Sequence, residues 1–126
     1  MKHVFNALLL VGALAGAQAY AACDYPIAPG KFPDGTQATK DEMLTAKHAV
    51  EKYNADIEAY LTCIKSEFDA KIAAQTDATP DQKAEMERVQ LQKHNAAVEE
   101  VTAVAARFNE QLRAWKAKNM PEKKPS

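Results

Sequence analysis

The stretch Thr76-Asp77-Ala78-Thr79-Pro80-Asp81-Gln82, residues 76–82, decides the fold because it ends one helix and begins another. Thr79 and Gln82 form a T-x-x-Q capping box, in which each residue satisfies a backbone N–H left unpaired at a helix start. Pro80 would be the first helical residue, where its missing N–H costs nothing. The stretch therefore predicts a short connection between a helix that ends near residue 75 and another that begins at residue 80.

The sequence before this connection predicts a helix over residues 39–75. It begins at a second capping box, T-x-x-E, formed by Thr39 and Glu42. Apolar residues then recur at heptad spacing along one narrow face, which comprises Met43, Ala46, Val50, Tyr53, Ile57, Tyr60 and Ile64. Phe68 and Ile72 continue this face one residue later than a strict heptad would.

The sequence after the connection predicts a helix over residues 80–118, followed by a disordered tail at residues 119–126. Two heptad series mark its apolar face: Ala84, Leu91, Val98, Ala105 and Leu112 in one, and Glu87, His94, Val101, Phe108 and Trp115 in the other. Two helices of similar length with a short connection should pack antiparallel. We therefore expect an all-α, coiled-coil-like hairpin over residues 39–118. This pairing places Trp115 at the start of the first helix, Phe108 near Lys47 and Val50, and His94 beside Tyr60 and Ile64.

Residues 22–38 precede the hairpin and are rich in proline and glycine, which excludes a helix and predicts an extended arm. Phe32-Pro33-Asp34-Gly35 is typical of a turn, with proline second and glycine fourth. Fully extended, the arm spans roughly 50 Å, enough to double back along the first helix. Tyr25, Ile27 and Phe32 would then pack over the groove between the two helices.

Two cysteines, Cys23 and Cys63, are present. In an exported chain they most often form a disulfide, which would pin the arm and stabilise a hairpin that has few large apolar residues. A redox-active pair is disfavoured because no C-x-x-C motif occurs. Acylation of Cys23 is a further alternative. However, Tyr20-Ala21-Ala22-Cys23 departs from the Leu-Ala-Ala-Cys pattern that is typical of lipoprotein signals.

Residues 1–21 have the features of a cleavable signal peptide: Lys2 at the start, an apolar stretch over residues 7–15, and an A-x-A site at residues 17–19 or 19–21. The apolar stretch is shorter than the approximately 20 residues that span a bilayer. No later segment is continuously apolar. We therefore expect a periplasmic or secreted protein with no transmembrane segment in the mature chain.

Charge and motifs argue against several functions. Removal of residues 1–21 takes Lys2 from the 16 basic residues and leaves 17 acidic ones, a net charge of −2, which disfavours a nucleic-acid partner. No nucleophile motif, phosphate loop or convergent acid pair is evident, so we expect no catalytic residue, no cofactor and no enzyme. His94 could suggest a metal ligand or a general base. However, metal sites need several ligands at helical spacing, and His48 does not supply one, so we expect no metal.

Cys23, Pro26, Pro29, Pro33-Asp34-Gly35, Glu42-Met43, Val50, Tyr53, Tyr60 and Cys63 resemble a pattern in small exported helical proteins of Gram-negative bacteria that have no assigned function. The resemblance covers about residues 23–63 and implies export and paired cysteines. We expect a non-enzymatic helical module that acts through protein contacts, with a protein partner or a homo-oligomer. One alternative is a periplasmic chaperone for unfolded clients, although the chain lacks the L-T-x-x-Q signature of Spy-like chaperones and the basic character of Skp-like ones. The other is an envelope protein anchored by a lipid on Cys23.

Overall fold

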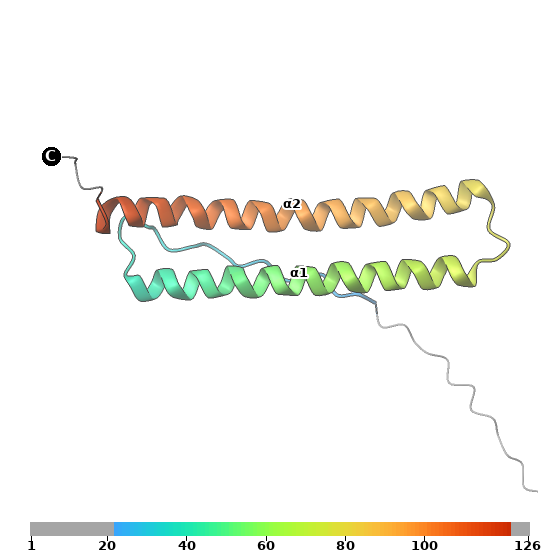
Figure 1. Cartoon of the computed structure of the whole chain (residues 1–126), viewed down its shortest axis with the longest axis horizontal. Helices are drawn as coiled ribbons and strands as arrows, with labels where there is room; N and C mark the ends of the chain where they lie inside the picture. The colour runs from blue at the N-terminus through green and yellow to red at the C-terminus, as the bar shows by residue number, and fades with distance from the viewer. Residues whose placement is uncertain (1–21, 122–126) are drawn as a thin grey trace, which may run out of the picture.

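Two long helices make up most of the chain in a computed structural model that describes residues 22–121. Helix α1 runs Lys40–Ala74 and helix α2 runs Pro80–Asn119, where the sequence predicted residues 39–75 and 80–118. The helices lie antiparallel, and the arm runs alongside them (Figure 1). The predicted all-α hairpin with a disulfide-pinned arm is therefore confirmed. The predicted signal peptide and residues 122–126 of the predicted tail lie outside the described residues.

Both helices begin at the capping boxes expected from the sequence. The Thr39 hydroxyl accepts a hydrogen bond from the Glu42 backbone N–H at 3.2 Å, and the Glu42 carboxylate accepts one from the Thr39 N–H at 2.8 Å. Thr79 and Gln82 make the equivalent pair at 3.3 and 2.9 Å, with Pro80 as the first helical residue. Because the side chains next to each helix start satisfy its first N–H groups, the two starts are determined locally.

The hydrophobic core is one stripe between the facing sides of the helices. Its buried members are Met43, Ala46, Val50, Tyr53, Ile57, Tyr60 and Ile64 from α1, and Ala97, Val104 and Phe108 from α2. They all lie in the part of the hairpin that the arm accompanies (Figure 1). Towards the connection, Phe68, Ile72 and Met86 are only half-buried. The tightly packed end of the hairpin is therefore the end that carries the arm.

One of the two heptad series predicted for α2 is wrong at Ala84, Leu91 and Val98, which are exposed, although Leu112 of the same series does pack against the core. Ala97 and Val104 are fully buried, each 0% exposed, whereas Val98, one residue after Ala97, is 40% exposed. Leu91 is 59% exposed, and the predicted core positions Ala84, Glu87 and His94 are exposed as well. His94 therefore does not enter the core beside Tyr60 and Ile64. In the other series, Val101, Phe108 and Trp115 do pack in or against the core.

The buried column of α2 is shifted by one position from the predicted one. Ala97 and Val104 share the buried cluster with Tyr53 and Tyr60 of α1, whereas Val98 is 40% exposed. By hydropathy alone, leucine is a better core residue than alanine, so the sequence pattern favours the neighbouring column that contains Leu91, Val98 and Leu112. Successive residues are about 100° apart around a helix, so the shift moves the predicted column from the centre of the seam to its flank.

Candidate functional site

The arm lies along the hairpin and is held at its first described residues by a disulfide. Cys23 and Cys63 are joined, with an S–S distance of 2.00 Å and a Cα–Cα distance of 5.9 Å. From Cys23 the arm runs back beside α1 to the point where that helix begins (Figure 1). The prolines of the arm keep it extended, since each lacks a backbone N–H for a helix.

Aromatic side chains of the arm contact both helices. Tyr25 packs edge-on against Tyr60 of α1, with ring centroids 4.9 Å apart, and Phe32 packs edge-on against Phe108 of α2 at 5.7 Å. The arm therefore forms the expected third layer over the seam. Ile27, however, is 94% exposed, contrary to the prediction that it packs over the groove. Ala28 packs against the core in its place, consistent with the three-residue turn of a proline-rich extended chain.

The arm turns into α1 at residues 34–37, so the turn predicted at residues 32–35 is wrong by two positions. The Gln37 N–H donates to the Asp34 carbonyl oxygen at 3.0 Å. The Asp34 carboxylate accepts hydrogen bonds from the Thr36 hydroxyl at 2.7 Å and the Thr36 N–H at 2.9 Å. These bonds lower the pKa of Asp34, and they favour a turn that begins at this residue rather than at Phe32.

Gly35 is buried against the backbone of α2. Its N–H donates to the Gln111 side-chain oxygen at 2.9 Å, and a Cβ placed on it would lie 1.9 Å from the Gln111 carbonyl oxygen. Its φ is not positive, so close approach requires glycine here rather than the turn conformation that the sequence suggested. The Trp115 indole N–H also donates to the Ala38 carbonyl oxygen at 3.1 Å. These contacts fix the second end of the arm, and no local signal could have predicted them.

An open cleft of about 830 Å³ separates the arm from the first turns of α1. Its floor is apolar and is made by Pro29, Phe32, Pro33, Ala46 and Ala49. Three exposed carboxylates border it, those of Asp34, Asp41 and Glu42, against a single ammonium group, that of Lys31. Hydrogen bonds from Thr39, first that of its backbone N–H, lower the pKa of Glu42. The cleft therefore combines an apolar floor with a negative rim, and the sequence did not predict it.

Two phenols meet a carboxylate where the arm crosses the seam. The Tyr25 hydroxyl donates to the Glu100 carboxylate at 3.5 Å, a long contact, while the buried Tyr53 hydroxyl has no hydrogen-bond partner among the described residues. Burial, reinforced by Tyr53 and by the charge of Glu100, raises the pKa of Tyr25 to about 12. Burial also raises the pKa of Tyr53. Both phenols are therefore neutral at physiological pH and serve as packing groups.

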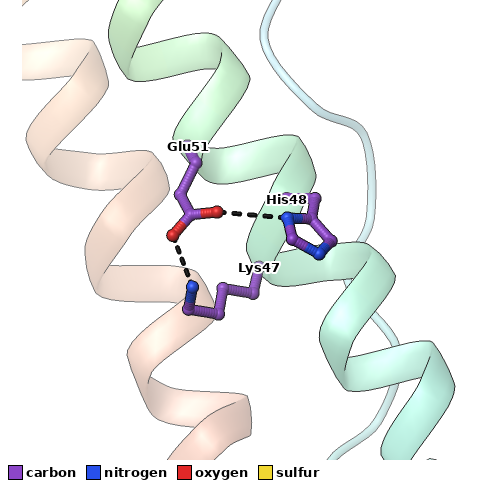
Figure 2. A network of polar contacts seen from close by, with 3 residues as sticks. All are labelled: Lys47, His48 and Glu51. Carbon is purple, nitrogen blue, oxygen red and sulfur yellow. Dashed lines mark hydrogen bonds and ion pairs between the residues drawn. The ribbon is translucent and has the colours of Figure 1, made fainter.

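The histidines lie on the surface. His94 is exposed, and within residues 22–121 no group of three or more His, Cys, Asp or Glu side chains is placed to hold a metal ion. His48 lies 3.2 Å from the Glu51 carboxylate, which also accepts a hydrogen bond from Lys47 at 2.5 Å (Figure 2). That bond is the main reason why the pKa of Glu51 is lowered. All three side chains are more than half exposed, which is typical of a solvated surface network.

Comparisons with models of known families, with curated proteins and with solved structures found no match. Neither helix of the described chain is long and apolar enough to cross a membrane. The arm and its cleft, which lie between the disulfide and the turn at residues 34–37, are therefore the candidate functional site.

Proposed function

We propose that this protein is an exported, non-enzymatic helical module that acts through protein contacts and holds a segment of its partner in the cleft between the arm and α1. The observation that carries this proposal is the cleft itself, with its apolar floor and three carboxylates against one ammonium group. An apolar side chain next to a lysine or arginine matches both features. The expected partner segment is therefore a basic, amphipathic peptide.

Preorganisation supports the proposal. The Cys23–Cys63 disulfide holds one end of the arm, and the contacts of Gly35 and Ala38 with α2 hold the other. Because the arm is already ordered, a ligand that enters the cleft does not lose binding free energy to the ordering of a flexible loop. An apolar cleft with a few charged groups at its edge is also the usual form of a binding site.

Binding of labelled peptides tests this function. Fluorescence anisotropy would compare a fluorescein-labelled peptide of alternating leucine and lysine with one in which glutamate replaces lysine. We expect the basic peptide to bind and the Asp41→Lys variant to bind it at least tenfold more weakly, a loss of about 1.4 kcal/mol. Asp81→Lys is the matched control, because Asp81 occupies the same first-turn position of α2 but does not line the cleft. Equal binding by both variants would eliminate the cleft as the site.

The same proposal includes export of the protein and a Cys23 that carries no lipid. A disulfide is typical of compartments outside the reducing cytoplasm, and residues 1–21 match a signal peptide. The alternative of a lipid on Cys23 requires a free thiol, whereas the Cys23 sulfur is bonded to Cys63. The intact mass of the protein made by its own host measures cleavage, acylation and the two-hydrogen loss of a disulfide together. A mass increased by acyl chains would favour the anchored form.

A chaperone for unfolded clients remains the second candidate, and one observation favours it. Ile27 is 94% exposed on the arm beside Tyr25, which is 41% exposed, so the arm presents apolar surface to solvent. This function predicts that the protein suppresses aggregation of a chemically reduced test protein and that Ile27→Ser weakens the effect. No suppression at a molar excess would eliminate this candidate.

A further inference from the structure

Residues 22–33 of the arm are held to the hairpin by one covalent bond and by side-chain packing. Among the described residues, no hydrogen bond joins the backbone of this part of the arm to either helix, and the bonds that do so begin at Gly35. The Tyr25 hydroxyl supplies only its long contact with Glu100. Fixing these residues in one conformation costs conformational entropy, and the disulfide reduces the cost because it restricts the arm before it docks. Retention of this part of the arm therefore depends on the disulfide.

The disulfide lies at the surface of the molecule. Cys63 is exposed and Cys23 is half-buried, and both line an open hollow of about 460 Å³ beside the first residues of the arm, which we call the disulfide hollow. A disulfide is reduced when a thiolate reaches one of its sulfur atoms, and exposed disulfides are typically the labile or regulatory ones. Cys63, the more exposed of the two, is therefore the expected point of attack.

The lining of the disulfide hollow favours a protein over a small anionic thiol. Ile27 of the arm and Ala59 of α1 give it apolar walls, and Ile27 is 94% exposed, so a partner surface can cover it. Asp24 and Asp56 also line the hollow, and of the two only Asp56 makes an ion pair among the described residues, with Lys52. The Asp24 carboxylate therefore repels an anionic thiol such as glutathione. The matching occupant is a protein dithiol with apolar surface around its thiols.

Reduction proceeds by two thiol–disulfide exchanges. A thiolate of the dithiol attacks the Cys63 sulfur, the bond to Cys23 breaks, and the Cys23 sulfur leaves as a thiolate that takes up a proton. The second thiol of the dithiol then loses its proton and attacks its neighbouring sulfur in the mixed disulfide. The Cys63 sulfur leaves as a thiolate and is protonated, and the dithiol becomes a disulfide. Two electrons therefore pass from the dithiol to the cysteine pair, which transfers them no further.

Loss of the bond removes one wall of the cleft between the arm and α1. Pro29 and Phe32 form part of the apolar floor, and both belong to the segment that the disulfide retains. The turn that follows keeps its own contact with α2, in which the Gly35 N–H donates to Gln111. Reduction therefore frees residues 22–33 and leaves the turn and the hairpin in place.

We propose that the Cys23–Cys63 disulfide is a redox switch of the arm. A protein dithiol docks in the disulfide hollow and reduces the bond, residues 22–33 leave the helices, and the cleft loses its shape. Only the oxidised protein then holds a peptide. This last step rests on the function proposed above, whereas the docking of the dithiol and the release of the arm do not.

Nuclear Overhauser contacts between aromatic rings test the release of the arm. In the oxidised protein we expect contacts between the rings of Phe32 and Phe108, which pack edge-on. After reduction with dithiothreitol these contacts should disappear while helical circular dichroism is retained. The contact of the Trp115 indole with Ala38 is the internal control and should persist. Ring contacts that survive reduction, or loss of the helices together with the arm, would overturn the proposal.

Reduction kinetics test the docking of a protein dithiol. Reduced thioredoxin serves as the protein probe and dithiothreitol as the small one, with free cysteines counted by alkylation and mass spectrometry. Thioredoxin should reduce the bond at least tenfold faster at equal concentration. Ile27→Ser should remove most of this advantage and leave the dithiothreitol rate unchanged. Leu91→Ser is the matched control, because Leu91 is also exposed, 59%, but lies outside the hollow. Equal rates with both probes, or no effect of Ile27→Ser, would overturn the docking.

Peptide binding separates the switch from the proposed function. The labelled peptide of leucine and lysine should bind the oxidised protein. The reduced protein and a Cys23→Ser, Cys63→Ser double variant should bind it at least tenfold more weakly, because the arm is no longer preorganised. Equal binding by oxidised and reduced protein would overturn the switch and leave the proposed function standing. No binding by the oxidised protein would overturn the proposed function, while the ring contacts and the reduction rates still decide the release of the arm.

Discussion

Replacement of both Cys23 and Cys63 by alanine should lower the free energy of unfolding by about 4 kcal/mol. The two cysteines are separated by 40 residues, and in the chain-entropy model a closed loop of that length restricts the unfolded state by about this amount. A domain of this size has a total stability of about 5–15 kcal/mol. The disulfide therefore accounts for a large share of the stability of a hairpin whose core has only ten buried residues within the described part of the chain.

Urea denaturation followed by circular dichroism measures this loss. With a slope of about 2 kcal/mol per M, the midpoint should fall by about 2 M, and chemical reduction of the parent should reproduce the curve of the double variant. Trp115 is the single tryptophan and contacts the Ala38 carbonyl, so its fluorescence reports on the far end of the arm in the same experiment. Both signals should change together if the arm and the hairpin unfold as one unit.

A loss below about 1 kcal/mol would refute this reasoning, because it would mean that the disulfide does not limit the unfolded state as the chain-entropy model requires. A tryptophan transition that precedes loss of helix would refute the single cooperative unit. In that case the edge-on contacts of Tyr25 with Tyr60 and of Phe32 with Phe108 would not be enough to keep the arm in place.

Two further predictions concern the arm. Gly35→Ala should destabilise the protein by more than about 2 kcal/mol, because the added Cβ would overlap the Gln111 backbone. Gly30→Ala is the control: a Cβ there would meet nothing within 4 Å, so this variant should be neutral or slightly stabilised. Equal thermal unfolding of the two variants would contradict the close contact assigned to Gly35. Spectrophotometric titration should show a tyrosine step near pH 12 that is lost in Tyr25→Phe. The pKa of Tyr25 is higher in the folded state than the ordinary 10.0. The contribution of Tyr25 to the free energy of unfolding should therefore be complete below pH 10 and disappear between about pH 10 and 12. Parallel curves of stability against pH for the parent and for Tyr25→Phe would contradict this.

Features set by nearby residues could be predicted well. The helix starts at Thr39 and Thr79 depend on side chains three residues away, and α1 kept its whole predicted stripe from Met43 to Ile64. The disulfide followed from the cysteine count and the reach of the arm. The cleft between the arm and α1 could not be predicted, because it exists only once Phe32 and Pro33 are placed against Ala46 and Ala49.

The sequence by itself determined two capped helices, a short connection and an arm with one possible disulfide, because each of these depends on local hydrogen bonding, on residue spacing or on chain length. Only the tertiary structure decided which column of α2 enters the core. The column Leu91, Val98, Ala105 and Leu112 is the more apolar one, but Ala97 and Val104 are the residues that share the buried cluster with Tyr53 and Tyr60. Hydropathy alone does not set which of two neighbouring columns faces the other helix, because that depends on how the two helices pack against each other. The same kind of distant contact, with the backbone at Gln111, is what requires glycine at position 35.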